Sequence, residues 1–193
     1  MAYPQYPHST YDIFRNAVNG QFVDLDGQYG AQCWDGACLI YVQDDVGQYL
    51  YTAHNVGQGE GTAKSCWINV DARNRNASGH FSPIYNKTEI KKGDIIVFNT
   101  YSGWYGSAGH IGYADEDYNG TDYINVLGEN QGTGSNPTTG KAFSINRLYL
   151  GTAFLGAFRY DAWNQPTPPP PTPTHRKRHF PYPIAWNNWW KYY

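Results

Sequence analysis

The sequence predicts an α+β fold in which N-terminal helices pack on an antiparallel sheet. Two helical patterns come first, and four short segments rich in β-branched and aromatic residues follow them. Helices followed by a run of strands are typical of α+β domains. Aromatic residues make up 17% of the 193 residues and glycine contributes 21 residues, which favours a twisted sheet with many turns over a helical bundle.

Two segments have the residue pattern of helices. Residues 11–19 (YDIFRNAVN) predict an amphipathic helix with Ile13, Phe14 and Ala17 facing the core. Residues 33–43 (CWDGACLIYVQ) predict a buried helix despite an internal glycine.

The predicted strands are short and bounded by Gly or Asn turns. Between the second helix and these strands, residues 57–82 are rich in Gly, Asn and Ser and allow no assignment. The strands are expected at residues 94–99, 110–114, 122–127 and 153–160.

A proline-rich segment divides the chain into unequal parts. Residues 1–163 contain ten Lys and Arg against sixteen Asp and Glu, whereas residues 164–193 contain four Lys and Arg and no acid. The intervening run QPTPPPPTPT predicts an extended, semi-rigid spacer, because proline fixes φ and removes a hydrogen-bond donor. We therefore expect a main folded domain at 1–163, a linker at 164–174 and a short basic, aromatic segment at 175–193.

Composition excludes several classes of protein. No window approaches 18 consecutive apolar residues, so no membrane span is expected. The first twelve residues lack the pattern of a secretory signal peptide. The net charge of −2 argues against a general nucleic-acid binder, and three cysteines do not form a disulfide framework.

A cysteine and a histidine stand in settings suited to catalysis. Cys33 lies where a Gly-containing loop becomes a helix, and the amides and dipole of a helix start lower a thiol pKa. His110 opens a strand and has small neighbours that leave room for a substrate. Taken alone, either residue is also compatible with packing. Cys38 and Cys66 are expected in the core, and a bridge between them stays open.

A polar group follows the next predicted strand, in the motif VLGENQG. Glu129, Asn130 and Gln131 can each accept a hydrogen bond from an imidazole N–H. Antiparallel pairing of the two strands would bring this group beside His110. A nucleophile, a base and a residue that orients the base are the minimum for cysteine-dependent acyl transfer. The alternative is an ordinary polar turn.

The loop before Cys33 has the spacing of calcium ligands. Asp24, Asp26, Gln28, Gly30 and Asp35 occupy the first, third, fifth, seventh and twelfth positions of one stretch. An EF-hand loop uses these offsets, with a backbone carbonyl at the seventh, although its glycine is at the sixth position and its last ligand is Glu. Hard oxygen donors favour Ca²⁺ over Zn²⁺. The alternative is a solvated acidic turn.

Four motifs in order carry a resemblance to a known family. DLDGQYGAQCWD, KKGDIIVF, GHIGYA and VLGENQG resemble the CHAP domain, and the resemblance spans residues 11–160. CHAP domains are cysteine, histidine-dependent amidohydrolases or peptidases of papain-like fold. Many of them are bacteriophage lysins or bacterial cell-wall hydrolases.

The resemblance implies roles for particular residues. The nucleophile of the family falls on Cys33 and its general base on His110. Asn130 is the expected orienting residue, with Glu129 as a shifted substitute, because alignment on the Asn puts Gly128 at the position of the family's Glu. The calcium ligands of a phage-lysin branch fall on the five residues of the acidic loop, and this ion would be structural.

The implied activity is hydrolysis of an amide bond in bacterial peptidoglycan through an acyl-enzyme. The Cys33 backbone N–H and a neighbouring donor, Gln32, would hold the oxyanion. Trp34, Trp104 and Tyr105 are candidates to pack on sugar or stem peptide, and each is equally suited to core or rim packing.

Two biological roles fit this resemblance. In the first, the chain is a phage endolysin, made in the host cytoplasm, whose segment 175–193 binds the cell wall. In the second, it is a component of the phage tail, as a virion-associated lysin or as a structural protein with a CHAP-like domain. There, residues 175–193 would anchor the chain to other tail proteins.

Overall fold

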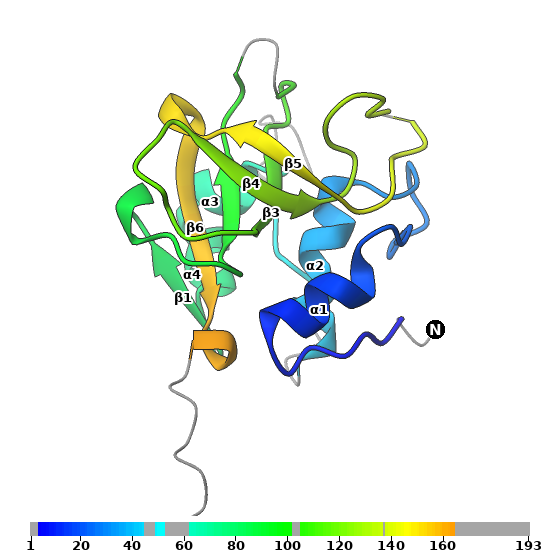
Figure 1. The fold of residues 1–193 in the computed structure, drawn as a ribbon, viewed down its shortest axis with the longest axis horizontal. Helices are drawn as coiled ribbons and strands as arrows, with labels where there is room; N and C mark the ends of the chain where they lie inside the picture. The colour runs from blue at the N-terminus through cyan, green and yellow to red at the C-terminus, as the bar shows by residue number, and fades with distance from the viewer. Residues whose placement is uncertain (1–3, 45–48, 53–61, 102–104, 137, 165–193) are drawn as a thin grey trace, which may run out of the picture.

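In the computed structural model, helices α1 and α2 pack against one side of a six-stranded sheet (Figure 1). The structure describes residues 4–44, 49–52, 62–101, 105–136 and 138–164. The helices are α1 Tyr11–Val18, α2 Cys33–Gln43, α3 Ser65–Ile68 and α4 Val70–Asn76. The strands are β1 Phe81–Ile84, β2 Ile95–Phe98, β3 His110–Ala114, β4 Tyr123–Gly128, β5 Ser144–Tyr149 and β6 Phe154–Tyr160. The predicted linker beyond residue 164 and the segment 175–193 lie outside the described residues.

The predicted α+β class and antiparallel sheet are confirmed. The strand order is β1-β6-β2-β3-β4-β5, and every pairing is antiparallel. The four predicted strands match β2, β3, β4 and β6 to within a residue or so at each end. Strands β1 and β5 were not predicted, and they form the two edges of the sheet.

Alternate side chains of the sheet belong to two apolar clusters. Ile95 and Val97 of β2 pack with the helices, whereas Ile96 and Phe98 join a second cluster on the other face. This alternation is the period of two expected of a strand with both faces covered. Cys38 and Cys66 are both buried in the first cluster, as predicted, and both are free thiols.

The phase of α1 differs from the prediction. Its buried residues are Tyr11, Phe14 and Val18, whereas Ile13 is 42% exposed and Ala17 is half-buried. Residues three and four positions apart share a helix face, so the aromatic ring of Tyr11 sets the inner face and turns Ile13 outward. Trp163 closes over the same face, with its indole N–H donating to the His8 carbonyl at 2.8 Å.

Helix α2 is buried over most of its length, as its apolar sequence predicted. Every residue from Asp35 to Val42 is buried. Gly36 is required because a Cβ atom there would lie 2.8 Å from the Phe143 ring and 3.1 Å from a Glu129 carboxylate oxygen. Among the described residues, no helix has the length and apolar character needed to cross a bilayer.

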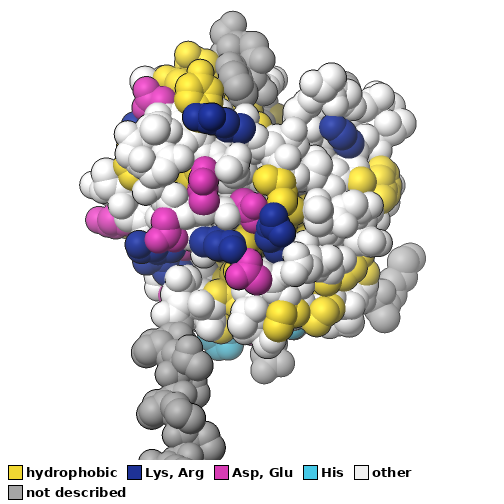
Figure 2. Space-filling model, viewed as in Figure 1, with side chains coloured by type: hydrophobic (Ala, Val, Ile, Leu, Met, Phe, Trp, Pro, Cys, Tyr) yellow, Lys and Arg dark blue, Asp and Glu magenta, His cyan; other side chains and the backbone are white. Residues whose placement is uncertain are grey.

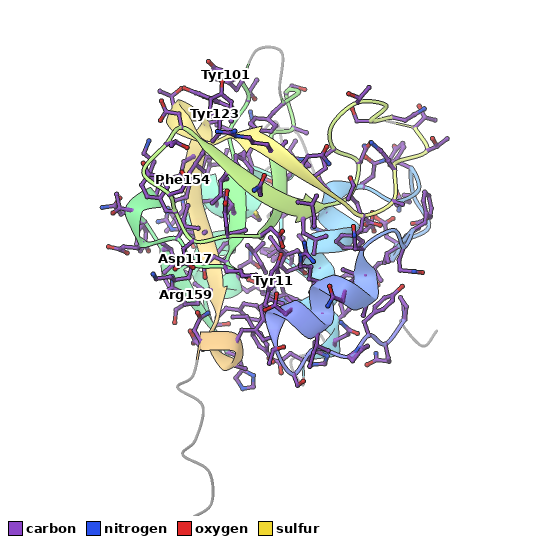
Figure 3. All side chains as sticks on the ribbon, in the orientation of Figure 1. Tyr11, Tyr101, Asp117, Tyr123, Phe154 and Arg159 are labelled. Carbon is purple, nitrogen blue, oxygen red and sulfur yellow. The ribbon has the colours of Figure 1, made fainter. Side chains whose placement is uncertain are left out.

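An ion pair joins strand β6 to the start of β2. The Arg159 guanidinium, labelled in Figure 3, donates two hydrogen bonds, at 2.9 and 2.8 Å, to the carboxylate of Asp94. Asp94 is fully buried. Burial raises the pKa of Asp94 above its ordinary value, and the hydrogen bond from Arg159 acts against this effect. Paired geometry of this kind compensates a buried carboxylate and fixes the two strands relative to each other.

Candidate active site

Cys33 is the first residue of α2 and is half-buried. Burial raises the pKa of its thiol to about 11, whereas the backbone amides of Ile111 and Trp34 lower this pKa. Because Ile111 directly follows His110 on β3, the sulfur lies beside the segment that presents the histidine. The contact between α2 and β3 therefore places the Cys33 sulfur against the backbone of β3, one residue along the chain from His110.

His110 begins β3 and is buried, with 6% of its surface exposed. Its ring lies parallel to that of Tyr105, with centroids 5.7 Å apart and an angle of 3° between the planes. Burial lowers the pKa of His110 to about 4, although its hydrogen bond to Gln131 acts in the opposite direction. The imidazole is therefore neutral at neutral pH and is able to accept a proton.

Gln131 fixes the orientation of His110. The His110 Nε2 and the Gln131 Oε1 are 3.0 Å apart. The Gln131 Nε2 donates to the carbonyl oxygens of Val126 at 2.8 Å and Ser144 at 2.6 Å, so both of its protons are used. The atom facing the imidazole must then be an acceptor, and we infer that His110 Nε2 carries the proton. Nδ1 is left with a lone pair.

This network corrects the expectation that Asn130 or Glu129 orients the histidine. The Asn130 amide donates to Gln32 Oε1 at 2.6 Å, and its Oδ1 accepts from the Asn136 amide. The Glu129 Oε1 accepts from the Val23 amide at 2.8 Å. Asn130 adopts φ of 48°, in the left-handed region. This turn breaks the alternation of β4, so the polar residue that reaches His110 is the third of the group.

Glu129 instead lies near Asp35, the other buried acid, which belongs to the first turn of α2. Its side chain is fully buried, and its Oε2 has no hydrogen-bond partner within the described part of the chain. Burial raises the pKa of Glu129 to about 9, and the neighbouring Asp35 and Asp24 add to this effect. Burial likewise raises the pKa of Asp35 to about 7, against the amides of Gln32 and Leu25 that donate to it. Burial therefore disfavours the ionised forms of Glu129 and Asp35.

Three of the five predicted calcium ligands converge. One carboxylate oxygen from each of Asp24, Asp26 and Asp35 lies within 4.8 Å of the others. Asp24 and Asp26 are exposed and Asp35 is buried, so the group spans the loop and the first turn of α2. Hard oxygen donors this close together suit Ca²⁺. The expected carbonyl ligands, on Gln28 and Gly30, stay a prediction.

A pocket of about 490 Å³ opens beside His110. Its described lining comes from the start of β3, the segment after β4, strand β5 and the residue that stacks on the histidine: Tyr105, His110, Asn130, Gln131, Gly132, Thr133, Ser135, Asn146, Arg147 and Leu148. The lining is polar and its only charge among these residues is Arg147. The pocket is thus suited to a largely uncharged, hydrogen-bonding ligand.

The other candidate residues have different surroundings. The Gln32 side-chain amide donates to the carbonyl oxygens of Tyr29 at 2.5 Å and Asn136 at 3.5 Å, so its N–H groups already have partners. The Trp34 indole donates to the Leu50 carbonyl and stacks on Tyr49, as a packed rim residue does. Trp104 lies outside the described residues.

Comparison with known proteins supports a relationship to phage cell-wall hydrolases. No family model matches the chain. The chain is 28% identical over 152 residues to the D-alanyl-L-alanine endopeptidase of Streptococcus phage B30, which covers 78% of this chain and 30% of that protein. The fold of this chain is similar to that of the endolysin LysIME-EF1, with a TM-score of 0.58 and 23% sequence identity. The match covers 76% of this chain and 60% of the endolysin chain. The predicted likeness to phage lysins is confirmed, and the chain spans under a third of the curated relative.

The role of Gln131 can be tested by replacing it with methionine, which has a similar size but no carbonyl acceptor. We expect Gln131→Met to leave His110 without a fixed tautomer, because the acceptor for Nε2–H is lost. Nitrogen-15 NMR of the labelled histidine reports the tautomer directly. Asn130→Ala is the matched control and should keep the Nε2–H form; loss of that form in both variants would contradict the assignment.

Proposed function

We propose that the chain is a thiol-dependent peptidoglycan hydrolase of the CHAP type. The observation that carries this proposal is the Cys33 sulfur beside Ile111, next to a neutral His110 whose Nε2–H is held by Gln131. The similarity to a phage endopeptidase and to an endolysin fold supports the substrate class. The D-alanyl–L-alanine bond named for the relative is the first bond to test.

The proposed reaction is acyl transfer through a thioester. His110 Nδ1 takes the proton of the Cys33 thiol as the sulfur attacks the carbonyl carbon of the scissile amide. The backbone amides at the start of α2 stabilise the oxyanion of the tetrahedral intermediate. His110 then gives its proton to the leaving amine, and water, deprotonated by the same imidazole, releases the acyl group.

Calcium is proposed as a structural ion held by Asp24, Asp26 and Asp35, with the carbonyls of Gln28 and Gly30. When bound, it would neutralise the carboxylates and order the loop that precedes α2. Asp35 belongs both to this cluster and to the first turn of the Cys33 helix. The ion would therefore stabilise the position of the nucleophile without taking part in the reaction.

The nucleophile is tested by Cys33→Ala on purified Gram-positive peptidoglycan. We expect released amino groups to fall by about 10³-fold or more, because a triad-type nucleophile contributes on this scale. Cys38→Ala is the matched control, since this thiol is buried further along the same helix, and it should keep measurable activity. Mass spectrometry of the fragments identifies the bond. Equal behaviour of wild type and Cys33→Ala would instead favour a structural or binding role.

The pH dependence follows from the burial of His110. Protonated imidazole cannot act as a base, so kcat/KM should fall only as pH drops toward about 4, well below the ordinary histidine pKa of 6.5. Gln131→Met should move this acidic limb lower, because the hydrogen bond that it removes raises the His110 pKa. A soluble stem-peptide substrate gives the profile, with circular dichroism to confirm folding. An acidic limb near 6.5 would contradict the buried neutral base.

The calcium site is tested by melting temperature and activity with and without a chelator. We expect calcium to raise the melting temperature, because an ion that binds the folded state alone stabilises it by mass action. Asp24→Asn should abolish this rise while keeping the oxygen that accepts from the Gly27 amide. Asp71→Asn, on α4, is the control. Unchanged values after thorough chelation would remove calcium from the proposal.

A further inference from the structure

Three tyrosines form a connected surface at one end of the sheet. Tyr101 stacks on Tyr149 with centroids 4.3 Å apart, and Tyr123 meets Tyr149 edge-on at 5.5 Å. The Arg147 guanidinium lies 5.3 Å from the centre of the Tyr123 ring. Tyr123 is 37% exposed, and Tyr101 and Tyr149 are half-buried. Figure 3 labels Tyr101 and Tyr123 at this end.

This tyrosine surface is joined to the wall of the pocket. The Tyr105 hydroxyl donates to the Tyr149 carbonyl at 2.8 Å, and the Tyr105 ring lies parallel to that of His110. Arg147 itself lines the pocket. In Figure 2, hydrophobic side chains and a Lys or Arg side chain lie next to one another at the upper left of the view, the end of the molecule where Figure 3 labels Tyr101 and Tyr123. A ligand longer than the pocket can therefore continue onto these rings.

We propose that Tyr101, Tyr123, Tyr149 and Arg147 bind the saccharide chain of peptidoglycan while the pocket beside His110 takes the peptide. The proposal rests on the proposed function, since the stem peptide branches from a saccharide in that polymer. A pyranose ring has an apolar C–H face that packs on an aromatic ring, and hydroxyl groups at its edge. Tyrosine supplies both an apolar ring and a polar tip, and arginine supplies N–H donors for sugar oxygens.

The charge of the surface favours a saccharide over a polyanion or an apolar protein segment. Among the residues that the structure describes, Arg147 is the one cation that contacts a ring of this surface, the ring of Tyr123. The nearby Lys87 is paired with Asp122 at 3.2 Å, so the two charges offset each other. A surface that binds a polyanion, such as a phosphate polymer, needs several cations in a row. Three hydroxyl groups on the rings suit a neutral ligand with many hydrogen-bonding groups.

The tyrosine rings are also packed against one another before a ligand binds. Tyr101 and Tyr149 stack with their centroids 4.3 Å apart and 23° between their planes, so each ring limits the movement of the other. Rings fixed before binding lose little conformational entropy when a ligand arrives. The stacking therefore lowers the entropy that Tyr101 and Tyr149 would lose on binding a ligand.

The test measures affinity for peptide-free glycan strands by calorimetry, and kcat/KM on intact peptidoglycan and on a free stem peptide. We expect Tyr123→Ala to weaken glycan binding by about fivefold, the effect of about 1 kcal/mol from one ring contact. It should raise KM on intact peptidoglycan and leave hydrolysis of the free peptide unchanged. Tyr123→Phe keeps the ring and should retain most of the affinity.

Tyr85→Ala is the matched control. Tyr85 is 62% exposed and follows β1, at the opposite edge of the sheet from β5. Wild type that fails to bind glycan, or equal weakening in the Tyr85 and Tyr123 variants, would overturn the proposal. Glycan binding that depends on Tyr123 in a chain that cannot hydrolyse the wall would uphold this surface and reject the hydrolase. If the chain hydrolyses both the free peptide and the wall, and Tyr123→Ala changes neither glycan binding nor KM, the hydrolase is upheld and the tyrosine surface is rejected.

Discussion

Helix α2 is held on strand β3 by the Tyr113 hydroxyl, which lies 3.0 Å from the Gly36 carbonyl and 3.1 Å from that of Ala37. This contact occurs one turn after Cys33, where Gly36 lets Phe143 and Glu129 approach the helix closely. A close-packed helix of this kind cannot shift without opening voids around it. The position of Cys33, the proposed nucleophile, relative to β3 depends on this packing.

Burial then sets the charge state of the site. It disfavours the ionised form of each group, so the thiol of Cys33 and the carboxyl of Glu129 hold their protons while the imidazole of His110 stays neutral. A resting pair without charge needs no compensating ion beside the pocket. In the proposed reaction, charge develops when the thiol proton moves to the imidazole, and the backbone amides at the helix start would then stabilise the oxyanion.

The sequence predicted an element best where all of its residues share one environment, such as full burial. The apolar run of α2 and the β-branched strands β2 and β3 predicted buried elements correctly. Strand β5 (SINRLY) was missed because an edge strand with one exposed face has mixed polarity. The motif VLGENQG located the residue that orients His110 but could not choose it, because the choice depends on the left-handed turn at Asn130. The helical phase of residues 11–18 depended in the same way on the tertiary partner Trp163.

Strands β4 and β5 connect the two ends of the proposed substrate site. Gln131, just beyond β4, is held by the Val126 and Ser144 carbonyls, one from each strand, and Tyr123 faces Tyr149 at their other end. A slip of one residue in this pairing would turn every side chain of one strand to the opposite face. It would therefore separate Gln131 from Ser144 and Tyr149 from Tyr123 at once. The register that fixes the base also fixes the tyrosine surface, so reaction geometry and ligand position are set by one pair of strands.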